Sequence, residues 1–549
     1  MTRYAKHFTL HGRTDQRSAA TTGQLKNAAG GYVFGVDLWT RLDRFLVLGI
    51  DGGTYYAAER SHLMDNLQVV HDCLSADGVR TVERIVHISV SGRAPKQDPA
   101  IFALSVAASC DEPSTRKRAL AALPEVCRTG AHLLAFVDCV RRFRGFGRGL
   151  RRALCCWYLS HEPARLAYQV IKYQRRGGYS QRDVLRLCGG AMGPRSVAHD
   201  ALLRWVVAGV DGLGARAVTR AGSTHTYAAI DRSALPSLVE AYEVIKRETD
   251  PERAATLIRT HRLTHEMVPG ELKTAPAVWE ALLAHMPMTA LIRSLGKLSA
   301  VGVLSPLSPA VEQVTARLGD PVRIRRARLH PLSILVALNT YRSGRGVRGK
   351  LSWTPVGAIV DALDAAFYTA FDAITPTGAR TLLALDVSGS MACGQIAGMT
   401  GVTPRIGSAA MAMATVRTEP NYHTMAFSHR LQPVTLSKKM RIDRVVRDLS
   451  TIPMGRTDCA LPMQFALEQR IGVDAFVVYT DNETWFGQVH PFEALRHYRD
   501  RMGIDAKLIV VGMTATKFSI ADPSDAGMLD VVGFDTAAPS LMADFVRGS

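Results

Sequence analysis

The residues best suited to chemistry in this chain are three short oxygen-bearing side chains, Asp386, Ser388 and Ser390. They follow an apolar run at 382–385, which predicts a buried strand of a parallel sheet. Alternate residues at the carboxyl end of such a strand can direct a carboxylate and two hydroxyls toward one point. Hard oxygen ligands of this kind suit a small divalent cation, so the pattern predicts a magnesium site.

Two further loops carry residues that could join this site. Asp481 follows an apolar run at 475–480, and Thr457 and Asp458 stand just before a predicted helix at 460–469. The order Asp-x-Ser-x-Ser, then Thr-Asp, then a strand-end Asp resembles the metal-ion-dependent adhesion site (MIDAS) of von Willebrand factor A domains. This resemblance implies that Mg²⁺ binds Asp386, Ser388, Ser390 and Thr457, with Asp481 behind them or also coordinating. Such sites leave a position open for a partner's acidic group, which favours binding over turnover.

Other uses of these residues remain open. The two serines could cap the segment after the strand, and Asp458 could cap the next helix. A strand-end Asp is also the acceptor of aspartyl phosphotransferases, but those enzymes usually have a second acid where Ser388 stands. Neither serine has an obvious base, so nucleophilic catalysis has little support. A hydrolase or nuclease has less support still, because no paired acids suggest two-metal chemistry.

The elements around the site predict an α/β domain at 377–549. Strands are expected at 381–386, 422–427, 475–481 and 506–512, and helices lie between them at 407–418, 460–469 and 491–502. Strands that alternate with helices predict a doubly wound parallel sheet.

The preceding part of the chain is helical in pattern. Residues 1–28 are polar and predict a mobile arm, whereas 29–376 carry helical periodicity with few strand signals. Helix pairs stacked over such a length predict an α-solenoid with a groove for an extended partner. The predicted helices span 38–48, 80–90, 101–108, 132–143, 149–159, 165–174, 197–210, 235–247, 278–285, 307–318, 334–341 and 356–374.

Charge divides the chain in the same place. The formal net charge of the 549 residues is +18, yet residues 381–549 sum to about −1, so the helical part carries the whole excess. A basic body beside a neutral domain predicts a polyanionic partner, with nucleic acid first and an anionic membrane second. No apolar run is long enough for a transmembrane helix, and no membrane association is expected.

Three clusters of basic residues are candidates for phosphate binding. The first, at 141–152, has six arginines, no acid and two interleaved aromatic residues. The second spans 172–186, and the third lies in a stretch without acids at 321–350. Arginine forks suit phosphate oxygens, and phenylalanine can stack on an unpaired base. A solvated surface is the alternative for any one cluster. The predicted RNA-binding residues are Arg141, Arg142, Arg144, Arg148, Arg151, Arg152, Lys172, Arg175, Arg176, Arg182, Arg186, Arg348 and Lys350.

The nine cysteines form no CxxC pair and are odd in number, which predicts reduced thiols and a cytoplasmic protein. The first residues lack an apolar core of signal-peptide length, so secretion is not expected.

Over most of its length the chain resembles the Ro autoantigen, or TROVE-domain, family of RNA-binding proteins, including the bacterial members. The stretches that carry this resemblance are 31–33 through 51–56, 286–293, 330–332 through 346–350, and 480–484. The resemblance implies a ring of HEAT-like helical repeats closed by the A domain. It also implies Y RNA on the outer basic face and the ends of misfolded non-coding RNA in the ring.

The same resemblance implies a non-enzymatic, monomeric protein of RNA quality control that acts with a 3′ exoribonuclease and has no specificity for DNA. One stretch departs from the family pattern. Arg182 keeps the charge of a lysine that contacts RNA, but Gly189 stands near the position of a contacting histidine. Recognition of Y RNA is therefore expected to differ in detail. A metal-dependent protein-binding adaptor, acting through the A domain, is the alternative function.

Overall fold

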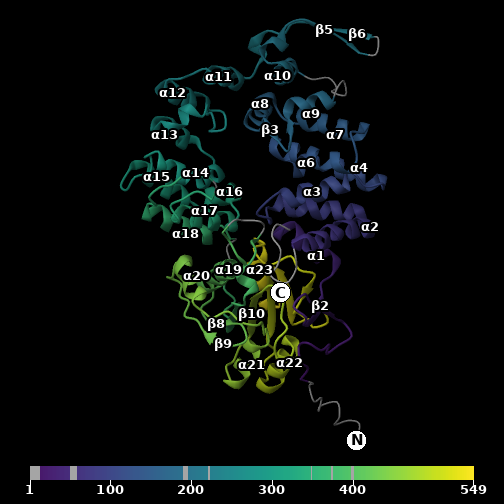
Figure 1. Ribbon diagram of the computed structural model, residues 1–549, viewed down its shortest axis with the longest axis vertical. Helices are drawn as coiled ribbons and strands as arrows, with labels where there is room; N and C mark the ends of the chain where they lie inside the picture. The colour runs from purple at the N-terminus through teal and green to yellow at the C-terminus, as the bar shows by residue number, and fades with distance from the viewer. Residues whose placement is uncertain are drawn as a thin grey trace.

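The computed structural model describes residues 13–49, 59–188, 196–220, 223–347, 349–371, 375–396 and 401–548. Helices dominate the chain up to about residue 370, and a six-stranded sheet with helices on both faces follows (Figure 1). The predicted division into a helical part and an α/β domain is confirmed. Among the described residues, every helix is too short or too polar to span a bilayer.

Many helices of the first part begin with proline in the first turn, where its missing N–H has no helical partner to lose. The helices are α1 (Leu38–Leu48), α2 (Glu59–Ser91, broken at Asp77), α3 (Asp98–Ala107), α4 (Pro113–Ala121), α5 (Leu123–Val126), α6 (Gly130–Phe143), α7 (Arg148–Leu159), α8 (Pro163–Lys172), α9 (Gln181–Cys188), α10 (Val197–Ala208), α11 (Ser237–Ile245), α12 (Pro251–His261), α13 (Pro276–His285), α14 (Met288–Ala300), α15 (Pro309–Leu318), α16 (Pro321–Arg326), α17 (Pro331–Arg342) and α18 (Gly357–Thr369). Two hairpins interrupt them: β3 (Arg175–Arg176) with β4 (Tyr179–Ser180), and β5 (Arg216–Arg220) with β6 (Ser223–Tyr227).

The two ends of this helical array meet, so the array forms a closed ring. In Figure 1 the helices rise from α1–α3 on one side to α10, cross to α11, and descend to α16–α18 on the other. Arg328 Nη1 donates to the carbonyl of Val90 at 2.8 Å. His330 accepts from Leu332 N through Nδ1, so its Nε2 donates to the Arg93 carbonyl at 3.1 Å. These contacts join the end of α2 and the residues after it to the segment just before α17, and they form the seam of the ring.

The sheet of the C-terminal domain has the order β13-β11-β10-β7-β8-β9. Its first five members are parallel, which confirms the predicted doubly wound parallel sheet, and the short edge strand β9, which was not predicted, runs antiparallel to β8. A short loop between β8 and β9 allows only an antiparallel return. The strands are β7 (Thr381–Asp386), β8 (Tyr422–Phe427), β9 (Leu431–Pro433), β10 (Ala475–Thr480), β11 (Lys507–Gly512) and β13 (Met528–Val532).

Alternate residues of the strands face two different cores. Leu383 and Leu385 pack with α19 (Pro404–Thr418), α20 (Ile442–Ser450) and α23 (Ala538–Arg547), in a core continuous with that of the ring. Leu382 and Ala384 face α21 (Leu461–Glu468) and α22 (Pro491–Met502) on the side away from the ring (Figure 1). The carboxyl ends of the strands are therefore held rigidly from both faces.

The segment from residue 13 packs against the C-terminal domain and differs from the mobile arm expected for 1–28. Strands β1 (Gln24–Lys26) and β2 (Tyr32–Gly35) form an antiparallel sheet with β12 (Phe518–Ser519). Phe34 packs edge-on against Phe492 of α22, with ring centroids 5.2 Å apart. The segment is polar because it makes hydrogen bonds to the domain. Residues 1–12 lie outside the described residues.

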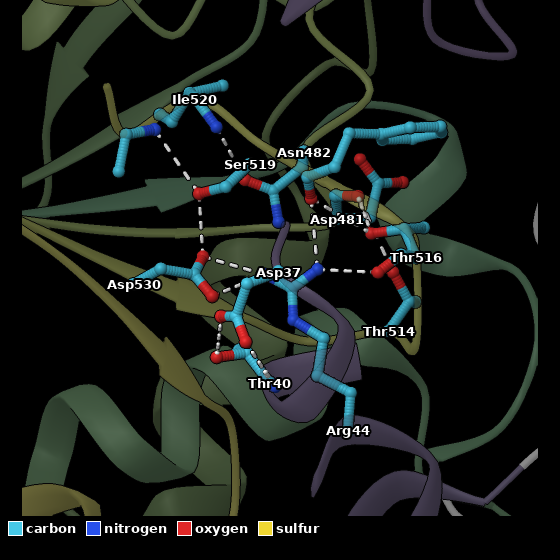
Figure 2. Close-up of polar contacts among 12 residues, drawn as sticks. Asp37, Thr40, Arg44, Asp481, Asn482, Thr514, Thr516, Ser519, Ile520 and Asp530 are labelled. Atoms are coloured by element: carbon cyan, nitrogen blue, oxygen red, sulfur yellow. Dashed lines mark hydrogen bonds and ion pairs between the residues drawn. The ribbon is translucent and has the colours of Figure 1, made fainter. Parts of the chain in front are cut away.

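A buried arginine joins the ring to the domain. Figure 2 shows Arg44 of α1 reaching Asp530 of β13, with both carboxylate oxygens within 2.6 Å of Nη2. Its Nη1 donates to the carbonyls of Thr516 and Phe518 at 2.6 and 2.9 Å. Thr516 also directs its hydroxyl to the carbonyl of Asp481 at 3.5 Å. One arginine thus contacts the same loop that supports a predicted metal ligand.

Candidate metal centre and nucleic-acid interface

The five predicted metal ligands lie at the carboxyl edge of the sheet and are all buried. Asp386 is the last residue of β7, and Asp481 directly follows β10. Ser388 Oγ lies 3.1 Å from Ser390 Oγ, and Thr480 Oγ1 donates to Asp386 Oδ2 at 2.8 Å. Parallel neighbours β7 and β10 end side by side, which brings the two carboxylates to one place.

The charges in this place are unbalanced. Burial, together with the neighbouring carboxylate of Asp481, raises the pKa of Asp386, and burial likewise raises the pKa of Asp481. Among the described residues, no Lys, Arg or His nitrogen lies within 4.0 Å of either carboxylate. The hydroxyl of Thr457, also buried, has no hydrogen-bond partner. Two buried acids and an unpartnered hydroxyl oxygen suit a bound cation.

The donor set is typical of a hard cation. The described residues contain no group of three or more His, Cys, Asp and Glu side chains placed to hold a metal. The site at Asp386 differs from such groups because it combines two carboxylates with three hydroxyls. That composition favours Mg²⁺ over zinc, which prefers nitrogen and sulfur ligands.

An arginine that the sequence pattern did not reveal holds the first ligand loop. Arg405 of α19 is buried, and its Nη2 donates to the carbonyls of Val387 and Ser388 at 2.7 and 3.3 Å. Burial lowers the pKa of this guanidinium. These two hydrogen bonds fix the backbone of the loop that carries Ser388.

The second ligand loop is held by the N-terminal segment. Gln16 is fully buried, and its Nε2 donates to Asp458 Oδ1 at 2.7 Å and to the Val489 carbonyl at 2.8 Å. Asp458 also accepts from Ala460 N at 3.0 Å, but α21 begins at Leu461 with Ala460 as its N-cap and no side-chain cap, so the helix-capping interpretation is wrong for this residue. Nothing in the sequence around Gln16 indicated this contact, because 442 residues separate it from Asp458.

The first basic cluster forms an exposed surface at the junction of α6 and α7. Arg141 and Arg142 are in the last turn of α6, where Arg141 contacts the Tyr179 hydroxyl and Arg142 pairs with Asp138 at 3.2 Å. Arg144 contacts Asp111 at 3.2 Å. The first turn of α7 contains no acid, and its arginines are exposed without a carboxylate within 4.0 Å in the described chain. Cations at the positive end of a helix destabilise it unless an anion binds. The α7 arginines are Arg148, Arg151 and Arg152.

A cleft of about 930 Å³ opens beside this surface. It lies between the end of α6, the β3–β4 hairpin and α9, and Phe146 and Tyr179 contribute aromatic surface to it. Asp138 and Asp183 are the two acids in its wall. Three predicted arginines, Arg141, Arg142 and Arg186, line it, and the exposed Arg182 lies on the same short helix as Arg186.

Other predicted RNA-binding residues lie elsewhere. Lys172 is mostly buried, with its Nζ 3.0 Å from the Tyr168 hydroxyl and 3.6 Å from Glu266, so the structure does not present it to a ligand. Arg175 is exposed on β3, and Arg176 pairs with Asp98 at 3.5 Å. Lys350 is exposed but far along the chain from the cleft, and Arg348 and Gly189 lie outside the described residues.

The chain is similar to known proteins over nearly its whole length. The TROVE domain model matches residues 25–340, and the Ro60 von Willebrand factor A domain model matches 380–546. The RNA-binding protein RO60 of Deinococcus radiodurans is 42% identical over 529 residues, covering 96% of each chain. The protein of the same name in Caenorhabditis elegans is 35% identical over 592 residues, covering 97% of this chain and 91% of the relative.

A solved structure agrees with these matches. The crystal structure of the D. radiodurans RO (RSR) protein superposes with a TM-score of 0.69 at 41% identity, covering 93% of this chain and all of the other. Both domain models, the sequence identity to the relatives and the similarity to the solved structure agree. This chain therefore belongs to the Ro60 family of TROVE-domain proteins.

Proposed function

We propose that the chain is an RNA-binding ring protein without a catalytic step of its own. The observation that carries this proposal is the row of exposed, unpaired arginines on α7 beside the aromatic-lined cleft. Phosphates would bind the guanidinium forks, and the positive end of α7 would add to the attraction. Phe146 offers a surface on which an unpaired base can stack. The names of the relatives support RNA as the class of ligand.

The RNAs that we propose are Y RNA, held on the outer basic face, and the 3′ ends of misfolded or structured non-coding RNA, held in the ring. Arg182, on α9, is exposed and available to such an RNA. In this role the chain presents RNA to a 3′ exoribonuclease for maturation or decay. Sequencing the RNA that co-purifies with the protein tests these identities, and a population without structured non-coding RNA would contradict them.

Salt dependence tests RNA binding itself. Affinity for a hairpin RNA with a single-stranded 3′ end should fall steeply with salt, with a log–log slope of about −0.7 for each phosphate contacted. Replacing Arg148, Arg151 and Arg152 with glutamate should weaken binding about a hundredfold and make the slope shallower. Arg501→Glu is the matched control, because this arginine is exposed and belongs to α22, the helix that lies on the side of the domain away from the ring (Figure 1). A flat salt response would refute the proposal.

We propose a second function for the A domain, that of a magnesium-dependent protein-binding adaptor. The unpartnered Thr457 hydroxyl and the two buried carboxylates support it. Asp386, Ser388, Ser390, Thr457 and Asp481 would hold the ion, directly or through water. When bound, Mg²⁺ supplies a positive charge with room for an oxygen of the partner. Calorimetric titration with Mg²⁺ tests this, and a protein that takes up no metal would exclude it.

A further inference from the structure

Two arginines stack on one tryptophan at the rim of the metal centre. The guanidinium of Arg17 lies 4.9 Å from the centre of the Trp485 ring, and that of Arg456 lies 5.7 Å from it. Arg456 also lies 5.1 Å from the centre of the Phe486 ring, which meets Trp485 edge-on. Both arginines are exposed, and neither has a carboxylate within 4.0 Å in the described chain. We call Arg17, Arg456, Trp485 and Phe486 the arginine–tryptophan clamp.

The clamp is fixed to the loop that carries a metal ligand. Arg456 directly precedes Thr457, and the Thr457 carbonyl accepts from Trp485 N at 3.2 Å and from Phe486 N at 3.0 Å. Arg17 follows the buried Gln16, which is bonded to Asp458. Each arginine is therefore the chain neighbour of a residue that holds or forms the ligand loop. A rigid attachment of this kind keeps both guanidiniums at the rim of the site.

Backbone geometry supports the same arrangement. Gly487 has φ +132°, and a Cβ there would lie 2.5 Å from the Asp458 carboxylate. A Cβ on Gly455 would lie 1.9 Å from His429 Nδ1. Glycine at these two positions lets the chain turn closely around the ligand loop and return beside it. The Trp485 and Phe486 residues consequently lie beside the loop that carries Thr457 and Asp458.

The stacking leaves the hydrogen-bonding edges of the guanidiniums free. An arginine on an aromatic ring loses conformational freedom but keeps its N–H fork available for a planar anion. Asp15, the acid nearest to Arg17 in the sequence, accepts from Arg17 N at 2.8 Å and from Gln488 Nε2 at 3.1 Å. Two oriented forks beside a cation site thus make a surface for several anionic groups at fixed spacing.

We infer that the arginine–tryptophan clamp docks an acidic segment of a partner protein, of which one carboxylate completes the metal shell and others pair with Arg17 and Arg456. This inference rests on the adaptor function proposed above. A protein partner fits better than RNA for two reasons. The Trp485 ring already carries two guanidiniums, so it offers little face for a base, and the domain lacks the excess positive charge that attracts nucleic acid.

Binding of a fluorescent hexaglutamate peptide to the full-length protein tests the inference. In the presence of Mg²⁺ the peptide should bind, and chelation of the metal should release it. Arg17→Ala with Arg456→Ala should weaken binding about tenfold, as expected for the loss of two charge-assisted contacts. Arg501→Ala is the control and should change nothing. Absence of peptide binding, or equal binding by the clamp variant and the control, overturns the inference.

Two parallel measurements separate the possible failures. Mn²⁺ titration followed by electron paramagnetic resonance reports the metal site alone and should be unchanged in the clamp variant. If the unaltered protein binds no Mn²⁺, the adaptor function fails and the metal-linked docking fails with it. If Mn²⁺ binds but the clamp variant binds the peptide as tightly as the unaltered protein does, only the inference fails. A labelled oligouridylate should bind the clamp variant normally, and a loss there would assign the surface to RNA and overturn the inference.

Discussion

The helical ring and the C-terminal domain present opposite kinds of charge to their ligands. In the ring, arginines such as Arg148 and Arg151 stand in solvent, so each costs little to keep charged and acts on a partner through its number and spacing. In the domain, Asp386 and Asp481 are buried side by side, so their charge demands a counter-ion at one fixed point. An exposed basic surface tolerates variation in its ligand, whereas a buried acidic pair selects by charge and size.

Removing a predicted metal ligand should have the largest effect, because it should lower Mg²⁺ affinity and leave RNA affinity unchanged. Asp386→Ala should lower Mg²⁺ affinity by more than about a hundredfold, because even outer contacts of metal sites cost 10–100-fold when lost. RNA affinity should be unchanged. Calorimetry with Mg²⁺ and anisotropy with RNA measure both, and the exposed Asp505→Ala serves as control. Loss of RNA affinity in a folded Asp386→Ala protein would place RNA at the metal centre.

The second largest effect is expected at the Arg44–Asp530 pair, which joins the ring to the domain. Arg44→Met removes a buried guanidinium that pairs with Asp530 and bonds two carbonyls, and it should lower the free energy of unfolding by about 3–5 kcal/mol. Arg380→Met breaks an exposed pair with Asp474 and should cost about 0–1 kcal/mol. Denaturant titration compares the two variants. Equal losses would mean that Arg44 is no special link between ring and domain.

The seam of the ring should weaken in acid. Burial lowers the pKa of His330 to about 4, although its Nε2 donates to the Arg93 carbonyl and Asp535 lies near. Since the folded state resists protonation, stability is fully present above pH 6.5 and falls by about 3 kcal/mol as the pH drops to 4. His330→Asn keeps the helix cap but cannot titrate. Unfolding measured across this range should be flatter in the variant, and identical profiles would exclude the role of His330.

A pair of substitutions with a small effect tests which basic residues meet RNA. Arg182→Ala should reduce RNA affinity about fivefold, the usual result of losing one phosphate contact. Lys172→Ala should leave RNA affinity unchanged and instead lower stability, because Lys172 is packed between Tyr168 and Glu266. Anisotropy and thermal unfolding on both variants distinguish these outcomes. The opposite pattern would reverse the assignment of the two residues.

The sequence predicts features that depend on neighbouring residues, and it does not predict contacts between residues far apart in the chain. Helix α1 and strands β7 and β8 match the predicted bounds because their hydrophobic periodicity is local. The predicted metal ligands could be named because Asp386 ends a strand, Asp481 follows one, and the remaining three stand in the adjoining loops. The burial of Lys172 was not foreseen, because a count of charges carries no information on burial. Gln16, Arg405 and Arg44 were not foreseen, since their partners lie far away in the chain and no local pattern marks them.

The pairing of Arg44 with Asp530 also constrains how the chain is made. The two residues are 486 positions apart, so α1 leaves the ribosome long before its partner strand exists. At about 5–20 residues per second, the wait is roughly half a minute to a minute and a half. During that time the helical part carries an arginine whose partner has not been made, together with β1 and β2, which lack β12. The joint between ring and domain can form only after synthesis is nearly complete, which makes the last strand of the sheet the step that fixes the ring to the domain.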